Sequence, residues 1–429
     1  MGPFRLELKK QPWLLHLAGL VALTLLFCVP LGHQLGILQT TYSYTDGMRH
    51  ADYEHRTAAA AHQEMVTAQK STVAALAAQT KTVANKASSA ALKAVRAIKA
   101  PLLAHQYLAV DSILLDVITR YPELVYRHEL YDLLGGPYVS GQVTAWESAT
   151  KRLRYAIQHG VDHPLTSDDT QSSTVATYDV FSRYGSYVWK RLWLNGGMHV
   201  WYKINPGTAL TWLFLCYATL VLASVFNFDR RNHTENLMRL TPRGDLGMIV
   251  TRAAVTVALI GAVAIGFTLL GNAANAIVSG HIWGSWSYPL VTVAHSTAYV
   301  SPVWQYIGNE LLLLMLWVFV LSGFTFVFSQ VVHNLLLLLA LDALTFLAVP
   351  LHLMELLPLA VQKLTPAFYT NPPALFAQDQ QFRGIVSLVP VWLVFLGWGV
   401  AAWVFGAFLL RARTRGYWRR SQGPRKAAA

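Results

Sequence analysis

The sequence predicts an all-α membrane protein with six transmembrane helices, cytoplasmic termini, and an α-rich extracytoplasmic domain between the first two helices. Three observations lead to this fold class. Only 13% of the 429 residues are charged, whereas a soluble globular chain carries about 25%. The charged residues avoid several apolar runs of about twenty residues, the length at which a helix crosses a bilayer. Finally, the basic residues gather in alternate segments between these runs.

Six apolar segments are long enough to cross a bilayer as helices, and we number them TM1 to TM6. They are residues 13–32, 208–228, 249–273, 306–328, 332–350 and 385–410. TM4 and TM5 are separated by little more than the sequence SQVVHN, which predicts a tight helical hairpin. Trp and Tyr residues lie near several of the ends, as they do at membrane–water interfaces.

The basic residues orient these segments. The stretch before TM1 (residues 1–12) carries three, residues 229–252 carry five, and the tail after TM6 (residues 411–429) carries seven. Residues 274–305 carry none, and residues 351–384 carry two. Because cytoplasmic segments of membrane proteins are enriched in Lys and Arg, both termini and the connector between TM2 and TM3 are predicted to be cytoplasmic. This placement also argues against a nucleic-acid partner, which needs a basic face on a folded domain.

The large segment between TM1 and TM2, residues 33–207, is then extracytoplasmic. Within it, residues 39–205 hold 17 basic and 14 acidic side chains, as expected of a water-exposed domain. Residues 57–99 are rich in Ala, Lys, Gln and Thr, and a second run of helix-forming residues follows Pro101. Because Ala and straight-chain residues favour helix, we predict two helices that pack side by side. The remaining extracytoplasmic segments are the loop 274–305 and residues 351–384.

No catalytic or metal site is evident in the sequence. His50, His55 and His62 do not have the i, i+4 spacing that places two ring nitrogens on one helical face. The sequence also contains no nucleophile elbow, HExxH motif or paired-carboxylate signature. We therefore predict no enzymatic activity, no catalytic residue and no metal ion.

The connector between TM2 and TM3, residues 229–248, carries the most specific pattern. Thr234 can cap a short helix that ends before Pro242, because the residue before a proline avoids the α region. This helix would present Glu235 and two basic side chains to the cytoplasm. The simplest alternative is an ordinary basic loop.

This pattern resembles the ABC-2-type permeases of ABC exporters. In that family a connector with the pattern Glu…Leu-x-Pro-x-Arg forms a coupling helix, which sits in a groove of the ATPase subunit. The resemblance implies that the coupling residues are Glu235, Leu240, Pro242, Arg243 and Arg252. Thr241 stands where the family has a Leu before the proline.

Two other segments share the resemblance. The N-terminal sequence FRLELKKQPWLLHL is similar to the family's amphipathic elbow helix, with Glu7 and Lys10 in the usual places. Residues 351–384, which are half apolar and broken by prolines, resemble the family's external re-entrant helices. A large external domain between the first two spans occurs in a subset of the family.

The resemblance also implies partners. The sequence contains no GxxxxGK[ST] phosphate-binding motif, so ATP would be bound and hydrolysed by a separate subunit and not by this chain. Six spans form half of a pore, which implies a homodimer or a paired permease. The expected function is export of a hydrophobic or amphipathic substrate (a lipid, drug or peptide) across a bacterial cytoplasmic membrane.

Two acidic residues fall inside predicted spans: Asp342 near the middle of TM5, and Glu310 nearer the outer end of TM4. A charged carboxylate inside a bilayer is unfavourable, so Asp342 must face protein or water or carry a proton. It could hydrogen-bond a neighbouring helix, or it could line a transport path, as could Glu310. Small residues in TM3, including Gly261 and Gly266, predict close helix packing.

Two other function classes stay open. One is a membrane receptor or sensor with a helical extracellular domain, which predicts a cytoplasmic output domain where the sequence shows a short basic tail. The other is a surface-anchored interaction protein in which TM2 to TM6 are only a scaffold. That protein would tolerate replacement of residues 229–248.

Overall fold

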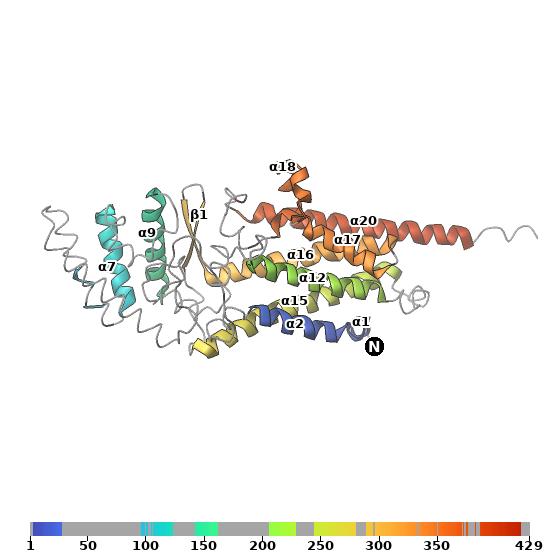
Figure 1. Cartoon of the computed structure of the whole chain (residues 1–429), viewed down its shortest axis with the longest axis horizontal. Helices are drawn as coiled ribbons and strands as arrows, with labels where there is room; N and C mark the ends of the chain where they lie inside the picture. The colour runs from blue at the N-terminus through green and yellow to red at the C-terminus, as the bar shows by residue number, and fades with distance from the viewer. Residues whose placement is uncertain are drawn as a thin grey trace, which may run out of the picture.

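The computed structural model of the chain is mostly helical. It describes residues 3–27, most of 96–122, 142–161, 206–228, 244–279, most of 289–388, and 389–421. The apolar helices form a bundle at one end of an elongated molecule, and the helices of the segment between TM1 and TM2 lie at the other end (Figure 1).

Among the described residues, the bundle contains six apolar helices. They are α2 (Trp13–Phe27), α12 (Pro206–Phe226), α15 (Gly244–Ser279), α16 (Val303–Val331), α17 (Leu335–Leu347) and α20 (Val389–Ser421). The short helix α1 (Pro3–Lys9) precedes α2. The described residues between α17 and α20 include the single-turn elements η3 (Leu353–Leu356), α18 (Leu359–Gln362) and η4 (Pro366–Tyr369). At the far end lie α7 (Tyr107–Arg120) and α9 (Gln142–His159), which pack against each other.

Three helices of the bundle are long and apolar enough to cross a membrane. The spans are Leu246–Gly271 in α15, Ile307–Val331 in α16 and Val389–Arg413 in α20. They suggest a multi-pass membrane protein, as predicted. Three shorter apolar helices occupy the positions of the predicted TM1, TM2 and TM5: Trp13–Phe27, Leu210–Phe226 and Leu335–Leu347.

The three long helices extend beyond the spans that were predicted for them, and α16 does so at both ends, from Val303 to Val331. Helix α15 begins at Gly244, within the predicted connector, and α20 continues to Ser421, within the predicted basic tail. Hydrophobicity defines where a helix can sit in lipid, whereas the helix itself continues until capping or a proline ends it. The predicted boundaries therefore give the ends of the apolar segments and not the ends of the helices.

An antiparallel hairpin departs from the predicted all-α class within the described residues. Strands β1 (Pro289–Ala294) and β2 (Thr297–Pro302) pair from Pro289 opposite Pro302 to Ala294 opposite Thr297. Their Val, Thr and Tyr residues favour strands, and the prolines stand at the outer ends of the pairing. The hairpin packs along α9, and β2 leads directly into α16, so it connects the α7–α9 pair to the bundle.

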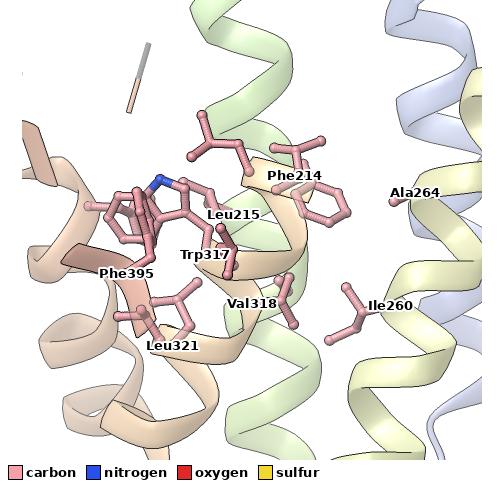
Figure 2. Close-up of a cluster of buried hydrophobic side chains, with 14 of the residues drawn as sticks. Phe214, Leu215, Ile260, Ala264, Trp317, Val318, Leu321 and Phe395 are labelled. Carbon is pink, nitrogen blue, oxygen red and sulfur yellow. The ribbon is translucent and has the colours of Figure 1, made fainter. Parts of the chain in front are cut away.

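A continuous apolar core joins the helices of the bundle. Trp317 of α16 is fully buried, and its ring packs edge-on against Phe395 of α20 with 5.2 Å between ring centres. Figure 2 shows this pair beside Phe214 of α12 and Ile260 of α15, so one cluster contacts four helices. Burial of these side chains fixes the helices relative to one another.

Glycines allow two helices of the bundle to approach closely. A Cβ atom on Gly399 of α20 would lie 2.3 Å from the ring of Phe319, and one on Gly406 would lie 2.5 Å from the ring of Phe326. Both rings belong to α16, which makes its most extensive contact with α20. Gly261 similarly faces Met315 of α16, so this glycine of the predicted TM3 does lie in a helix contact.

Candidate functional site

A buried ion pair connects the predicted elbow helix to the predicted third span. The Nε atom of Arg252 donates to Oε2 of Glu7 at 2.8 Å, and Nη2 donates to Oε1 at 3.4 Å. The Glu7 side chain is 0% exposed and that of Arg252 is 6% exposed. The structure thus brings together two residues that were predicted separately, one in α1 and one in α15.

Lys10 extends this contact to a third element. Its Nζ atom donates to Oε1 of Glu7 at 3.1 Å, so two cations share one buried carboxylate. The same Nζ lies 5.8 Å from the centre of the Phe228 ring, a distance at which a cation is attracted to an aromatic face. Phe228 lies just beyond the end of α12, next to the first residue of the connector.

A polar pair next to the ion pair continues the contact between these segments. Nε2 of Gln11 donates to the Thr256 hydroxyl at 3.1 Å, and that hydroxyl donates to the carbonyl of Arg252 at 2.9 Å. Thr256 lies four residues after Arg252, and Gln11 lies four residues after Glu7. Within α15 this spacing places Arg252 and Thr256 on one face. Gln11 follows the end of α1, and its Nε2 also donates to the carbonyl of Glu7 at 3.4 Å.

A further buried polar contact joins α2 to α12. Nδ1 of His16 lies 2.6 Å from the Tyr217 hydroxyl, within hydrogen-bond distance. The tyrosine ring can lie this close because Gly19 has no side chain: a Cβ there would be 2.4 Å from the ring. The N-terminal segment is therefore held by polar contacts to both α15 and α12.

We call Glu7, Lys10, Gln11, Arg252 and Thr256 the elbow cluster. It joins α1 to the third and fourth turns of α15 and to Phe228, two residues after α12, so it contacts both sides of the connector. Both α1 and the C-terminal part of α20 lie at this end of the bundle (Figure 1). The other predicted coupling residues, Glu235, Leu240, Pro242 and Arg243, lie outside the described residues. The structure therefore describes the segments on both sides of the connector.

The predicted membrane carboxylates lie in different places. Asp342 of α17 is fully buried, and its Oδ2 accepts a hydrogen bond of 2.8 Å from the Thr325 hydroxyl of α16. This is the hydrogen bond to a neighbouring helix that was one of the two alternatives for Asp342. Glu310 is also buried in α16, but it precedes Thr325 by fifteen residues, about 22 Å along the helix axis. The structure does not bring the two carboxylates into one site.

Sequence reasoning missed several members of these contacts, namely Gln11, Thr256, His16 and Tyr217. One signal was available, because polar side chains in or beside an apolar segment tend to face protein rather than lipid. That signal identifies the residues but not their partners, which depend on how the helices are rotated. In the part of the chain that the structure describes, no group of three or more His, Cys, Asp or Glu side chains could hold a metal ion.

Comparisons with protein-family models, with characterised protein sequences and with solved structures gave no match. The resemblance to ABC-2-type permeases therefore rests on the order of the segments and on the motifs given above.

Proposed function

We propose that this chain is the permease subunit of an ABC exporter and that a separate ATPase subunit drives it through residues 229–248. In this proposal the six apolar helices are six spans with both termini in the cytoplasm. The observation that carries the proposal is the buried contact of Glu7 with Arg252 and Lys10, because it ties the elbow helix to both flanks of the connector.

The elbow cluster supports this proposal because it would transmit motion. ATP-driven closure of the partner ATPases would push on the connector and displace the end of α12 and the start of α15. Helix α1 would follow α15, since the Glu7–Arg252 pair and the Gln11–Thr256 pair hold the two segments together. The helices would thereby shift between two arrangements, as in other switches biased by a ligand.

Burial divides the coupling residues into two groups. Arg252 is buried against Glu7, so in this proposal it positions the elbow and does not touch the ATPase. The ATPase would instead contact Glu235 and Arg243 of the connector, together with exposed basic side chains of α1 such as Arg5 and Lys9. The apolar spans suit a hydrophobic or amphipathic cargo, and a second permease chain, identical or paired, would complete the pore.

The direct test is whether an ATPase accompanies the chain. The full-length protein, tagged and purified from its own cells in mild detergent, is expected to bring with it a soluble ATP-binding-cassette subunit and ATP hydrolysis. Mass spectrometry of the purified fraction identifies that subunit. Glu235→Ala and Arg243→Glu are expected to abolish its retention, because they remove the polar contacts of the connector with the ATPase groove.

Lys151→Glu is the matched control, because it reverses a charge in the helix pair at the opposite end of the molecule. It should leave ATPase retention unchanged. Full retention of the ATPase by both connector variants would contradict the proposal. Absence of any ATPase from the unsubstituted protein would also contradict it and favour the sensor or the surface-anchored interaction protein.

A further inference from the structure

A groove of about 940 Å³ lies between α20 and the segment that follows α17, and we call it the α20 groove. Its lining is mainly apolar and includes Leu364, Leu393 and Trp398; Lys363 contributes the charged side chain among the described lining residues. Leu364 and Leu393 are 63% and 62% exposed, so the groove is open at the side of the bundle. Next to them, Gly397 leaves open space, because a Cβ on this residue would meet no atom within 4 Å.

The groove lies along the apolar length of α20 and not beyond its end. The indole N–H of Trp398 donates to the carbonyl of Leu364 at 2.7 Å. Trp398 lies nine residues after Val389, the first residue of the candidate span, which corresponds to about 14 Å along the axis. The segment after α17 therefore folds back against the membrane-spanning part of α20, and α18 stands out from the bundle beside it (Figure 1).

The folded-back segment exposes many apolar side chains beside the exposed pair of His352 and Glu355. Its exposed large side chains include Leu351, Leu353, Leu356, Leu359, Val361 and Leu364. A cluster of exposed apolar side chains is unfavourable in water and marks contact with a membrane or another apolar surface. This part of α20 belongs to a candidate membrane span, so within a bilayer the groove would open toward acyl chains.

The dimensions and charge of the groove fit one lipid chain. Its lining runs along α20 from Pro390 to Ala401, about 17 Å, which exceeds the roughly 15 Å of hydrocarbon in one leaflet. The half-buried Lys363 has a flexible stem that can extend its ammonium toward the headgroups, as lysines near membrane surfaces do. Its ammonium forms no hydrogen bond or ion pair with the described residues. A cation at this depth is stabilised by an anionic partner.

The wall of the groove that carries Lys363 is fixed in place. The Tyr369 hydroxyl donates to the carbonyl of Lys363 at 2.8 Å. Together with the Trp398 bond to Leu364, it holds two successive residues of the segment against the bundle. The groove is therefore a formed feature of the fold.

We propose that the α20 groove binds an anionic phospholipid, with one acyl chain along α20 and the phosphate paired with the Lys363 ammonium. The proposal requires only that α20 faces lipid. It is independent of the proposed coupling to an ATPase, so either one can fail without the other.

The test uses the full-length protein in nanodiscs and a phosphatidylglycerol that carries a photoreactive group in its acyl chain. After irradiation, mass spectrometry should locate the adduct on peptides that contain residues 387–401 or 361–369. Unlabelled phosphatidylglycerol should compete for this adduct more strongly than phosphatidylcholine with the same acyl chains. Lys363→Gln should reduce this preference about fivefold, the contribution of one basic residue next to an anionic membrane surface.

The variant Gly397→Phe tests whether the lipid binds in the α20 groove or elsewhere on the surface of the bundle. The new ring would fill the open space at Gly397 and is expected to abolish the adduct without disturbing the fold. Gly308→Phe is the matched control, because a Cβ at that glycine of α16 also meets no atom within 4 Å. It should leave the adduct unchanged.

Three outcomes would overturn the proposal. The first is an adduct that Gly397→Phe and Gly308→Phe affect equally. The second is equal competition by the two lipids in the unsubstituted protein. The third is an adduct replaced by a cross-link between two copies of the chain, which would assign the groove to a dimer contact.

Discussion

Two helix contacts in the molecule are close but depend on different interactions. Charged side chains join α1 to α15, whereas apolar packing joins α16 to α20. In the first, the buried carboxylate of Glu7 is shared by Arg252 and Lys10. In the second, aromatic rings of α16 lie directly on glycines of α20, as Phe319 lies on Gly399. The polar contact depends on matched charges, whereas the apolar contact depends on matched shapes.

This difference separates two roles within one bundle. Closely packed apolar side chains resist any change in the distance between two helices, because protein interiors pack as densely as organic crystals. A charged contact fixes which groups must meet but depends on a few atoms, so the loss of one partner has a large effect. The charged contact lies beside the connector and the shape-matched contact lies along the bundle. We therefore interpret α16 and α20 as the rigid part of the bundle. In the proposed function, α1 and the first part of α15 are the segments that move with the connector.

The largest expected effect comes from removing one partner of the buried ion pair. Arg252→Met should destabilise the protein by about 3 kcal/mol, near the lower end of the range for breaking a buried pair, because Lys10 still neutralises part of the charge on Glu7. The measurement is the free energy of unfolding of the full-length protein in mixed micelles. Adding Glu7→Gln to Arg252→Met should restore part of the loss, since the buried charge is then removed as well.

The matched control is Lys151→Met in α9. It removes one partner of the partly exposed pair Glu147–Lys151, whose Nζ and Oε1 atoms lie 2.6 Å apart. Pairs of this kind contribute about 0.3–0.5 kcal/mol. If Arg252→Met unfolds no more readily than Lys151→Met, the elbow cluster does not stabilise the fold as described.

A smaller effect is expected from the shape-matched contact. Gly399→Leu would place its Cβ 2.3 Å from the Phe319 ring, so the side chain can enter only if α16 and α20 move apart. Overpacking of this kind typically destabilises by about 1–3 kcal/mol. Thermal unfolding of the purified protein in detergent should show a lower midpoint than that of the unsubstituted chain.

Gly397→Leu provides the comparison on the same helix. Gly397 lies two residues away, and a Cβ there meets no atom within 4 Å. This variant should unfold at the same temperature as the unsubstituted protein. Equal losses in the two variants would mean that the loss at Gly399 does not come from contact with the Phe319 ring.

The two contacts also differ in how far the sequence could predict them. Glu7, Lys10 and Arg252 were identified in advance because their positions resemble those of a known family. Their mutual contact was not predicted, since 245 residues separate Glu7 from Arg252 in the sequence. The apolar contact was harder still, because which glycine of α20 meets which ring of α16 depends on the rotation of both helices.

The hairpin β1–β2 shows a different limit. Its residues are too few and too polar for a membrane span, and a two-stranded hairpin is marginal by itself. It forms here because α9, far away in sequence, covers it. Composition predicted the apolar helices well, because length and hydrophobicity are local properties. Polar partners and the hairpin depend on tertiary contacts, which local patterns do not contain.

The smallest expected effect concerns the hydrogen bond between Thr325 and Asp342, a polar contact within the apolar part of the bundle. Thr325→Val should destabilise the protein by about 0.6 kcal/mol, the average for a hydrogen bond between membrane helices. Asp342→Asn keeps an oxygen that accepts from the Thr325 hydroxyl and removes the acidic group. It should therefore change stability less than Thr325→Val, as measured by unfolding in detergent.

These two variants separate the two alternatives for Asp342. If the carboxyl serves only to join α16 and α17, function should follow stability, and Thr325→Val should impair it more than Asp342→Asn does. If the carboxyl lines a transport path, Asp342→Asn should abolish the activity of the assembled complex while leaving the fold intact. Two measurements distinguish these results: substrate-stimulated ATP hydrolysis by the proposed complex and its unfolding temperature. Loss of a purely structural hydrogen bond cannot change the ATP hydrolysis without also lowering the unfolding temperature.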